Sequence, residues 1–217
     1  MSHWTIVPVR GLAAGKSRLA GLLGPRERRA LNAMLLERAL DAVERCDGGL
    51  SRCIVASLGA DALALARERG ASPLPDARAS GLNVALEAAR DAARAKGASS
   101  ILVLAADLPD ANGGALSRLR DATPRGSAAI IADKRGSGTN GLLLPADCAL
   151  RFTFGDGSLA RHREAIRASG VQLTICNDPA LCFDIDSPAD YREWRSRPVH
   201  PCPSGLGKES HGFDAAK

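Results

Sequence analysis

The sequence predicts an α/β fold with a mainly parallel β-sheet. Short apolar segments alternate with longer segments whose apolar residues repeat at helical spacing, as they do in such folds. The most continuously apolar of the short segments, Ser100–Ala106, suits a central parallel strand that helices cover on both faces. The first, Trp4–Val9, runs into a basic, glycine-containing loop, and open α/β sheets bind ligands at the carboxyl ends of such strands.

Length and composition favour one domain. The chain has 217 residues, 45% of them hydrophobic, which is enough for a single sizeable core. We therefore expect one domain over residues 1–196. Residues 197–217 have no apolar periodicity, and we expect them to form a disordered tail.

Charge and composition exclude some classes of partner. Lys and Arg outnumber Asp and Glu by 29 to 24, but acids are interspersed among the arginines, and aromatic residues make up only 3%. This pattern is typical of solvated helix faces, so we expect no nucleic-acid partner. No apolar run approaches the roughly 18 residues of a membrane span, no leader precedes the first strand, and the six cysteines form no C-x-x-C pair. We expect a cytoplasmic protein with reduced, mostly buried cysteines and no membrane contact.

The first part of the chain predicts two strand–helix units and a third strand. Apolar residues repeat at helical spacing over Pro25–Cys46, and proline is tolerated in a first helical turn. The strand Arg52–Ser57 is followed by the helix Asp61–Arg69, which has an acid near its start and Gly70 just past its end. A short third strand is expected at Ser72–Pro75.

The middle of the chain predicts two further helices and two further strands. An alanine-rich helix follows Ser80–Asn83 and stops at Gly97. After the central strand, a helix is expected over Gly114–Asp121. The strands Ala128–Ala132 and Gly141–Leu144 are joined by a polar loop too short for a helix, so they form an antiparallel pair or lie apart.

The last part begins with a turn at Phe152–Gly157, after which Ser158 is expected to cap the helix Leu159–Ser169. Two short strands and a final helix start complete the domain: Val171–Ile175, Phe183–Asp186 and Ser187–Asp190.

The loop after the first strand has the chemistry of a phosphate site. Gly15 lets backbone N–H groups approach an anion, and Lys16 and Arg18 add positive charge. Gly11 and Gly15 enclose three residues, whereas the P-loop motif G-x-x-x-x-G-K-[ST] encloses four, so the spacing disfavours a P-loop. A longer, looser triphosphate-binding loop and an ordinary basic surface loop stay open as alternatives.

Three carboxylates are candidates for a cation site. Asp107 directly follows the central strand, where it needs a partner such as a metal ion or a helix start. Asp184 and Asp186 are two residues apart in a predicted strand, so they project from one face while Ile185 faces the core. The three would suit Mg²⁺, which prefers oxygen ligands. Alternatively, Asp184 is merely exposed and Asp186 merely precedes a helix.

A second anion site is possible at Thr139 and the turn Phe154–Ser158. A hydroxyl and the N–H groups of a helix N-terminus suit a carboxylate or phosphate, although an ordinary capped turn explains the second segment equally well. His162 is expected to be a surface or packing residue, because no serine or cysteine nucleophile motif accompanies it.

Six motifs in order resemble those of the 2-phospho-L-lactate guanylyltransferase family of coenzyme F420 biosynthesis, over about residues 5–191. They are IVPVRGLAAGKSRL, SGLNVAL, LAADLP, GTNGLLL, FGDGSLARH and DIDSPAD. The resemblance implies a three-layer, Rossmann-like sandwich of the nucleotide-diphospho-sugar transferase (GT-A) type and a homodimer. It also implies transfer of GMP from GTP to the phosphate of 2-phospho-L-lactate, phosphoenolpyruvate or 3-phospho-D-glycerate, with release of pyrophosphate.

The resemblance also implies a role for particular residues. The catalytic residues that hold the triphosphate would be Lys16 and Arg18, and the nucleotide-binding set would be Gly15, Lys16, Gly81 and Asn83. The acceptor's carboxylate would be held by Thr139, Gly155 and Ser158, and Mg²⁺ by Asp107, Asp184 and Asp186. The family commonly has lysine where this chain has Arg10 and alanine where it has Gly15.

Two other functions remain compatible with the sequence. One is a sugar-phosphate or molybdopterin nucleotidyltransferase of the same architecture. The other is a non-catalytic GTP-binding protein, which would bind GTP without releasing pyrophosphate.

Overall fold

The structure, a computed structural model, describes residues 2–46, 49–75 and 81–198. Its strands form one sheet in the order β3-β2-β1-β4-β6-β5-β7. Their bounds are β1 His3–Val9, β2 Cys53–Ser57, β3 Ser72–Pro75, β4 Ser100–Leu104, β5 Ala128–Ala132, β6 Thr139–Pro145 and β7 Leu173–Cys176. Strand β6 is antiparallel to β4 and β5, and the other pairs are parallel. The mainly parallel sheet is confirmed, and of the two alternatives for β5 and β6 the antiparallel pair is correct.

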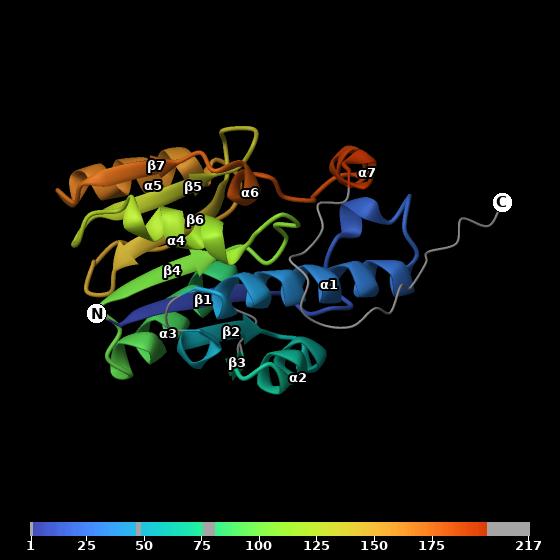
Figure 1. Ribbon diagram of the computed structural model, residues 1–217, viewed down its shortest axis with the longest axis horizontal. Coiled ribbons are helices and arrows are strands. Elements are labelled where there is room, and N and C mark those ends of the chain that lie inside the picture. Colours follow the sequence, from blue (N-terminus) through green and yellow to red (C-terminus); the bar gives the residue numbers. More distant parts are fainter. Residues whose placement is uncertain (1, 47–48, 76–80, 199–217) are drawn as a thin grey trace.

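Helices cover both faces of this sheet (Figure 1). They are α1 Pro25–Glu44, α2 Ala60–Glu68, α3 Leu82–Ala95, α4 Gly113–Asp121, α5 Ser158–Ala168, α6 Pro179–Cys182 and α7 Pro188–Ser196, with short 3₁₀ turns at Ser17–Leu19 and Leu50–Arg52. Apolar residues of α1, α2, α4 and α6 pack on one face, and those of α3 and α5 pack on the other. Successive strand residues point to opposite faces, so Val7 joins the first cluster and Ile6 the second. The result is the predicted three-layer sandwich.

A third apolar cluster lies at the end of the sheet away from the chain's N-terminus, where Figure 1 shows α7 (red) next to the short blue turn that precedes α1. It joins Leu19 of the 3₁₀ turn and Leu35 of α1 to Phe183 and Ile185, with Trp194 of α7 packed against it. This cluster ties the segment before α7 to the loop after β1.

Two local predictions are wrong. Phe183–Asp186 is not a strand, because it follows α6 away from the sheet and Ile185 N donates a single bond to Asp107 O (3.2 Å). Ser158 does not cap α5. Gly157 holds the cap position in a left-handed conformation (φ 68°), and Ser158 is buried in the first helical turn, where its hydroxyl donates elsewhere.

Other differences are shifts of one or two residues at element ends. The central strand stops at Leu104, and β7 covers Leu173–Cys176 where Val171–Ile175 was expected. Ser187 caps α7 as predicted, accepting from Asp190 N. Ser80 and the tail beyond residue 198 fall outside the described residues.

The five cysteines in the described ranges are free thiols, as expected, but only Cys53 is fully buried. The expectation that most cysteines are buried is therefore wrong for these five. None of the helices within the described ranges is long and apolar enough to span a bilayer.

Candidate active site

The structure brings the basic loop and the predicted acids together at the carboxyl ends of β1 and β4. Lys16 Nζ donates to Asp107 Oδ2 (2.7 Å) and to Asp186 Oδ1 (3.2 Å). The bond from Ile185 N to Asp107 O holds the two acidic segments side by side. Parallel strands β1 and β4 are neighbours, so the residues that follow them share one edge of the sheet. Lys16 thus forms one cluster with Asp107, 91 positions later in the chain, and with Asp186, 170 positions later.

Lys16 is held firmly in this cluster. Its side chain is only 8% exposed. Burial alone lowers the pKa of its ammonium, but the charges of Asp107 and Asp186 more than offset burial, so that pKa lies above its ordinary value. Its backbone is left-handed (φ 60°), which costs a non-glycine residue roughly 1 kcal/mol. Strain of this kind is retained where a side chain has to be aimed, which supports a functional role for Lys16.

The acids carry more charge than Lys16 can neutralise. Burial and the charges of Asp107 and Asp186 raise the pKa of Asp184 to about 6. Among the residues that the structure describes, no group of three His, Cys, Asp or Glu side chains is arranged to hold a metal ion by itself. The donor set of oxygens with excess negative charge nevertheless fits Mg²⁺, which takes part of its ligands from substrate phosphates.

The two other basic residues of this region are exposed. The Arg18 side chain is 66% exposed, and its Nη1 lies 3.9 Å from Asp186 Oδ2. Arg10 is exposed at the end of β1. Both side chains are free to reach a phosphate at the mouth of the site, whereas Lys16 lies inside it.

The loop between β1 and Lys16 is anchored from two sides. Gly11 has a positive φ (134°) and packs against Gly59, so closely that a Cβ on Gly59 would lie 2.5 Å from Gly11 Cα. Asp61 Oδ1 accepts from Leu12 N (3.2 Å). Asn32 Nδ2, buried on α1, donates to Leu12 O (2.8 Å). Both polar groups of Leu12 are thus bound, which fixes the start of the loop.

Gly15 is required by Asn32. An ideal Cβ on Gly15 would lie 2.7 Å from Asn32 Nδ2, and the Asn32 amide cannot move without losing its bond to Leu12 O. We therefore expect Gly15→Ala to lower the free energy of unfolding by about 1–2 kcal/mol in urea denaturation. Gly21→Ala is the control, since no atom lies within 4 Å of its added Cβ. Equal effects of the two substitutions would contradict this account.

Asp190 fixes the acidic segment from the other side. Its buried carboxylate accepts from Ser187 N (2.8 Å) and Asp186 N (3.2 Å), and pairs with Lys134 (2.7 Å) and Arg135 (3.0 Å). Burial opposes its charge, but these bonds prevail and hold the pKa of Asp190 well below its ordinary range. It therefore joins the 133–140 loop to the backbone of a predicted metal ligand.

The predicted acceptor residues lie together at the same end of the sheet. Thr139 begins β6, which is antiparallel to β4, so it lies near the end of β4. Ser158 Oγ donates to Thr139 Oγ1 (3.2 Å), and His162 Nδ1 lies 3.1 Å from the same oxygen. Gly155 adopts a positive φ (118°) in the turn before α5. The expected free N–H groups of this turn are partly used, because Ser158 N donates to Gly155 O (3.0 Å).

One of the two predicted nucleoside residues, Asn83, is bound to that turn. Gly81 caps α3 with a positive φ (95°). Asn83 Nδ2 donates to Phe154 O (3.2 Å) and Asn83 Oδ1 accepts from Phe154 N (2.8 Å), so the whole amide is bound to the turn. Asn83 therefore fixes the turn to α3, a contact that the sequence did not indicate.

His162 is fully buried and makes stability depend on pH. Burial and the charge of Arg161 lower the pKa of His162 from 6.5 to about 4. Between these values the unfolded chain binds a proton that the folded chain does not, so this contribution is complete above about pH 6.5 and lost as the pH falls towards 4.

From this shift we expect the stability advantage of wild type over His162→Gln to shrink by on the order of 3 kcal/mol from pH 7 to pH 4. Urea denaturation of both proteins across that range measures the difference. A difference that does not change with pH would show that the ring titrates normally.

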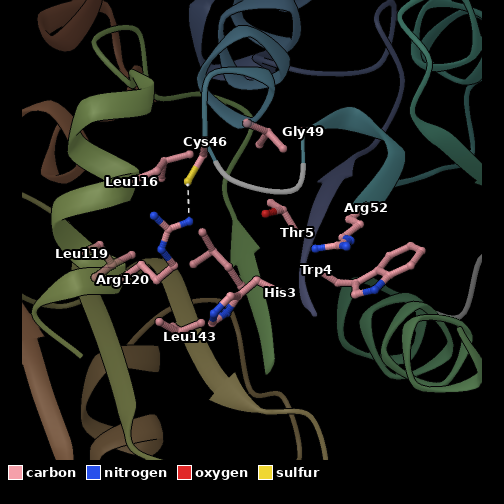
Figure 2. Close-up of a pocket in the computed structure, with 12 residues that line it drawn as sticks. His3, Trp4, Thr5, Cys46, Gly49, Arg52, Leu116, Leu119, Arg120 and Leu143 are labelled. Atoms are coloured by element: carbon pink, nitrogen blue, oxygen red, sulfur yellow. Dashed lines mark hydrogen bonds between the residues drawn. The ribbon is translucent and has the colours of Figure 1, made fainter. Parts of the chain in front are cut away.

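A separate hollow lies at the opposite end of the sheet (Figure 2), where β1 begins. Its lining is mostly apolar, with His3 and Trp4 from β1 and Leu119 from α4. Figure 2 shows Arg120 pointing at Cys46, and Arg120 Nη1 lies 3.4 Å from Cys46 Sγ. This hollow contains none of the predicted site residues, so the acidic cluster is the better candidate for an active site.

The chain is similar to known guanylyltransferases over most of its length. A family model described as "Guanylyl transferase CofC like" matches residues 3–195. A phosphoenolpyruvate guanylyltransferase of Rubrobacter xylanophilus is 39% identical over 191 residues, which cover 88% of this chain and 92% of the relative. One of Sphaerobacter thermophilus is 37% identical over 193 residues, covering 89% and 92%.

The fold is also shared with solved structures. A protein of Desulfovibrio desulfuricans G20, described as a nucleotide-diphospho-sugar transferase, superposes with a TM-score of 0.71 at 15% identity, over 89% of this chain and 87% of its own. This likeness confirms the predicted architecture.

Proposed function

Because the chain belongs to the CofC-like family of guanylyl transferases and is a nucleotidyltransferase, we propose that it transfers GMP from GTP to the phosphate of phosphoenolpyruvate. The choice of phosphoenolpyruvate over 2-phospho-L-lactate and 3-phospho-D-glycerate is supported by the names of the relatives at 37–39% identity. The observation that carries the proposal is the convergence of Lys16 with Asp107 and Asp186 at the carboxyl ends of the strands.

The reaction needs no side-chain nucleophile. An oxygen of the acceptor phosphate attacks the α-phosphorus of GTP, a new P–O bond forms, and the bond from the α-phosphorus to the bridging oxygen breaks as pyrophosphate leaves. The acceptor phosphate is already ionised near neutral pH, so no general base is needed. Catalysis then rests on positioning and on neutralising charge.

The basic and polar side chains supply both effects. Lys16 donates hydrogen bonds to phosphate oxygens, and its buried ammonium acts strongly because water is excluded around it. Arg18, at the exposed mouth, pairs with the outer phosphates. Thr139 and the turn at Gly155 bind the acceptor's carboxylate.

Asp107, Asp184 and Asp186 would hold Mg²⁺ beside Lys16. When bound, the ion supplies positive charge to the phosphates and to the leaving pyrophosphate. The carboxylates themselves orient Lys16 and hold the ion at the strand ends.

The product would serve coenzyme F420 biosynthesis, and the cytoplasm, which supplies GTP, is the proposed setting. We further propose that the protein acts as a homodimer, which sedimentation of the purified chain would test.

The experiment for this function is pyrophosphate release with GTP and each of the three acceptors, with the product mass determined. We expect release with phosphoenolpyruvate and Mg²⁺, and little with ATP in place of GTP. Release only with a sugar phosphate or molybdopterin would assign a different nucleotidyltransferase. GTP binding without pyrophosphate release from any acceptor would contradict an enzymatic role.

A further inference from the structure

His162 joins α5 to β6 and to the turn before α5. Its ring is fully buried and contacts Phe154 edge-on, with ring centroids 4.8 Å apart. Nδ1 lies 3.1 Å from Thr139 Oγ1, and Nε2 lies 3.1 Å from Thr153 N. The ring is too deep to touch a substrate, but both of its nitrogens reach the residues around the acceptor site.

These two contacts determine where the ring carries its proton. The backbone N–H of Thr153 can only donate, so Nε2 accepts and is unprotonated. A neutral imidazole has one proton, which is therefore on Nδ1 and is donated to Thr139 Oγ1. His162 is thus a donor to Thr139.

The Thr139 hydroxyl is left with a proton to donate and no lone pair to offer. Its oxygen accepts from His162 Nδ1 and from Ser158 Oγ (3.2 Å), which uses both lone pairs. Among the residues that the structure describes, no acceptor takes the remaining Thr139 proton. Since Thr139 is half-buried at the end of the sheet where Lys16 lies, this proton is available to an anionic group of a ligand.

We propose that His162 is a positioning residue that keeps the Thr139 hydroxyl a pure donor to the acceptor's carboxylate. The inference rests on the proposed function, in which Thr139 binds that carboxylate. A hydroxyl with a free lone pair could turn an electron pair towards the carboxylate and repel it. Filling both lone pairs from within the protein removes that alternative.

Replacing His162 with glutamine or with asparagine removes one of the two hydrogen bonds of the ring and keeps the other. A glutamine amide reaches the position of Nε2 and can still accept from Thr153 N, but it places no donor at Nδ1. An asparagine amide has the reverse effect, because its N–H lies near Nδ1 and it falls short of Thr153. Comparing the two variants therefore isolates the bond to Thr139.

The measurement is the KM for phosphoenolpyruvate and for GTP in each variant, from pyrophosphate release. We expect His162→Gln to raise the KM for phosphoenolpyruvate about tenfold and leave the KM for GTP unchanged. His162→Asn should keep the acceptor KM within about threefold of wild type, even though it loses the bond that anchors the turn.

Two threonine variants supply the matched control. Thr139→Val should raise the acceptor KM as His162→Gln does. The acceptor KM of the double variant should be no higher than that of Thr139→Val alone, because both substitutions remove the same interaction with the acceptor's carboxylate. Thr153→Val should leave the KM unchanged, since the Thr153 hydroxyl is buried without a partner in the described part of the chain.

Two results would overturn the inference. The first is an acceptor KM in His162→Gln equal to that of wild type. The second is a parallel rise in the KM for GTP, which would mean a general structural role. Failure of the proposed function is distinguishable, because then wild type itself releases no pyrophosphate with phosphoenolpyruvate, and the inference falls with it.

Discussion

Replacing Lys16 with methionine is expected to lower kcat about 10³-fold, the largest effect of any single substitution in this site. The ammonium is the buried positive charge of the cluster and donates to both Asp107 and Asp186. The free energy of unfolding should fall by only about 1–2 kcal/mol, because the carboxylates that lose their partner are 30% and 42% exposed and can be solvated. Steady-state pyrophosphate release and urea denaturation measure the two effects.

Lys96→Met is the matched control for this prediction. Lys96 lies at the C-terminal end of α3, near the start of β4 and at the opposite end of the sheet from the site. Its substitution should therefore leave kcat unchanged. Lys16→Arg keeps the charge but offers a planar guanidinium, so we expect it to recover only part of the rate. Retention of more than a tenth of wild-type kcat in Lys16→Met would exclude Lys16 from the chemistry.

Replacing Asp184 with asparagine is expected to abolish most turnover and at the same time stabilise the protein. As a proposed ligand of Mg²⁺, the carboxylate is needed in catalysis, so kcat should fall at least about 10²-fold. Its raised pKa of about 6 means that the folded protein holds its charge at a cost. Without divalent cations at pH 8, the variant should be more stable than wild type by roughly 1–3 kcal/mol.

The pH dependence identifies the cause of that gain. The pKa of Asp184 is higher in the folded protein than in the unfolded chain, so protonation of Asp184 favours folding. This contribution is complete below the unfolded-state pKa near 4 and is lost as the pH rises through about 6. The advantage of Asp184→Asn should therefore appear between these values and be absent at pH 4. His162 has the opposite slope in the same window, so each slope must be obtained as the difference between wild type and its own variant. A stability of Asp184→Asn below that of wild type at pH 8 would disprove the repulsion among the acids.

The central geometry could be predicted from sequence because it follows from strand ends. Asp107 and Lys16 follow neighbouring parallel strands, and their contact at 2.7 Å needs only the rule that such ends share one edge of the sheet. The alternation of Asp184, Ile185 and Asp186 also holds, with Ile185 fully buried, although the segment is not a strand. Alternating burial therefore does not require that the segment pair with a neighbouring strand.

The residues that support the site could not be predicted, because they act across the tertiary structure. Asn32 lies on α1, 20 residues from the carbonyl that it binds. From the sequence, Asp190 could be recognised only as a helix-start residue. In the structure it accepts a hydrogen bond from the backbone of Asp186 and pairs with the side chains of Lys134 and Arg135. One local signal existed for Asn32, which is a polar residue next to Leu31 on the buried stripe of an amphipathic helix.

His162 is a packing residue, one of the two roles expected for it, but its hydrogen bonds could not be predicted. Sequence reasoning tested it as a catalyst and found no nucleophile, which left a packing or surface role. Its contacts come from β6 and from the turn at Thr153, and neither pairing has a sequence signature. Ser158 was assigned to a cap for its residue type, but its hydroxyl serves Thr139 because Gly157 already provides the left-handed residue before the helix.

The central claim is that Lys16 and the three acids move GMP onto an acceptor phosphate. Its most direct test is the fate of ¹⁸O placed in the phosphate of phosphoenolpyruvate, followed by mass spectrometry after incubation with GTP and Mg²⁺. We expect one GMP joined to the labelled acceptor for each pyrophosphate released, all label in that product, and no product with Asp107→Asn. Free GMP with the acceptor left unjoined, or the same product from Asp107→Asn, would contradict the claim.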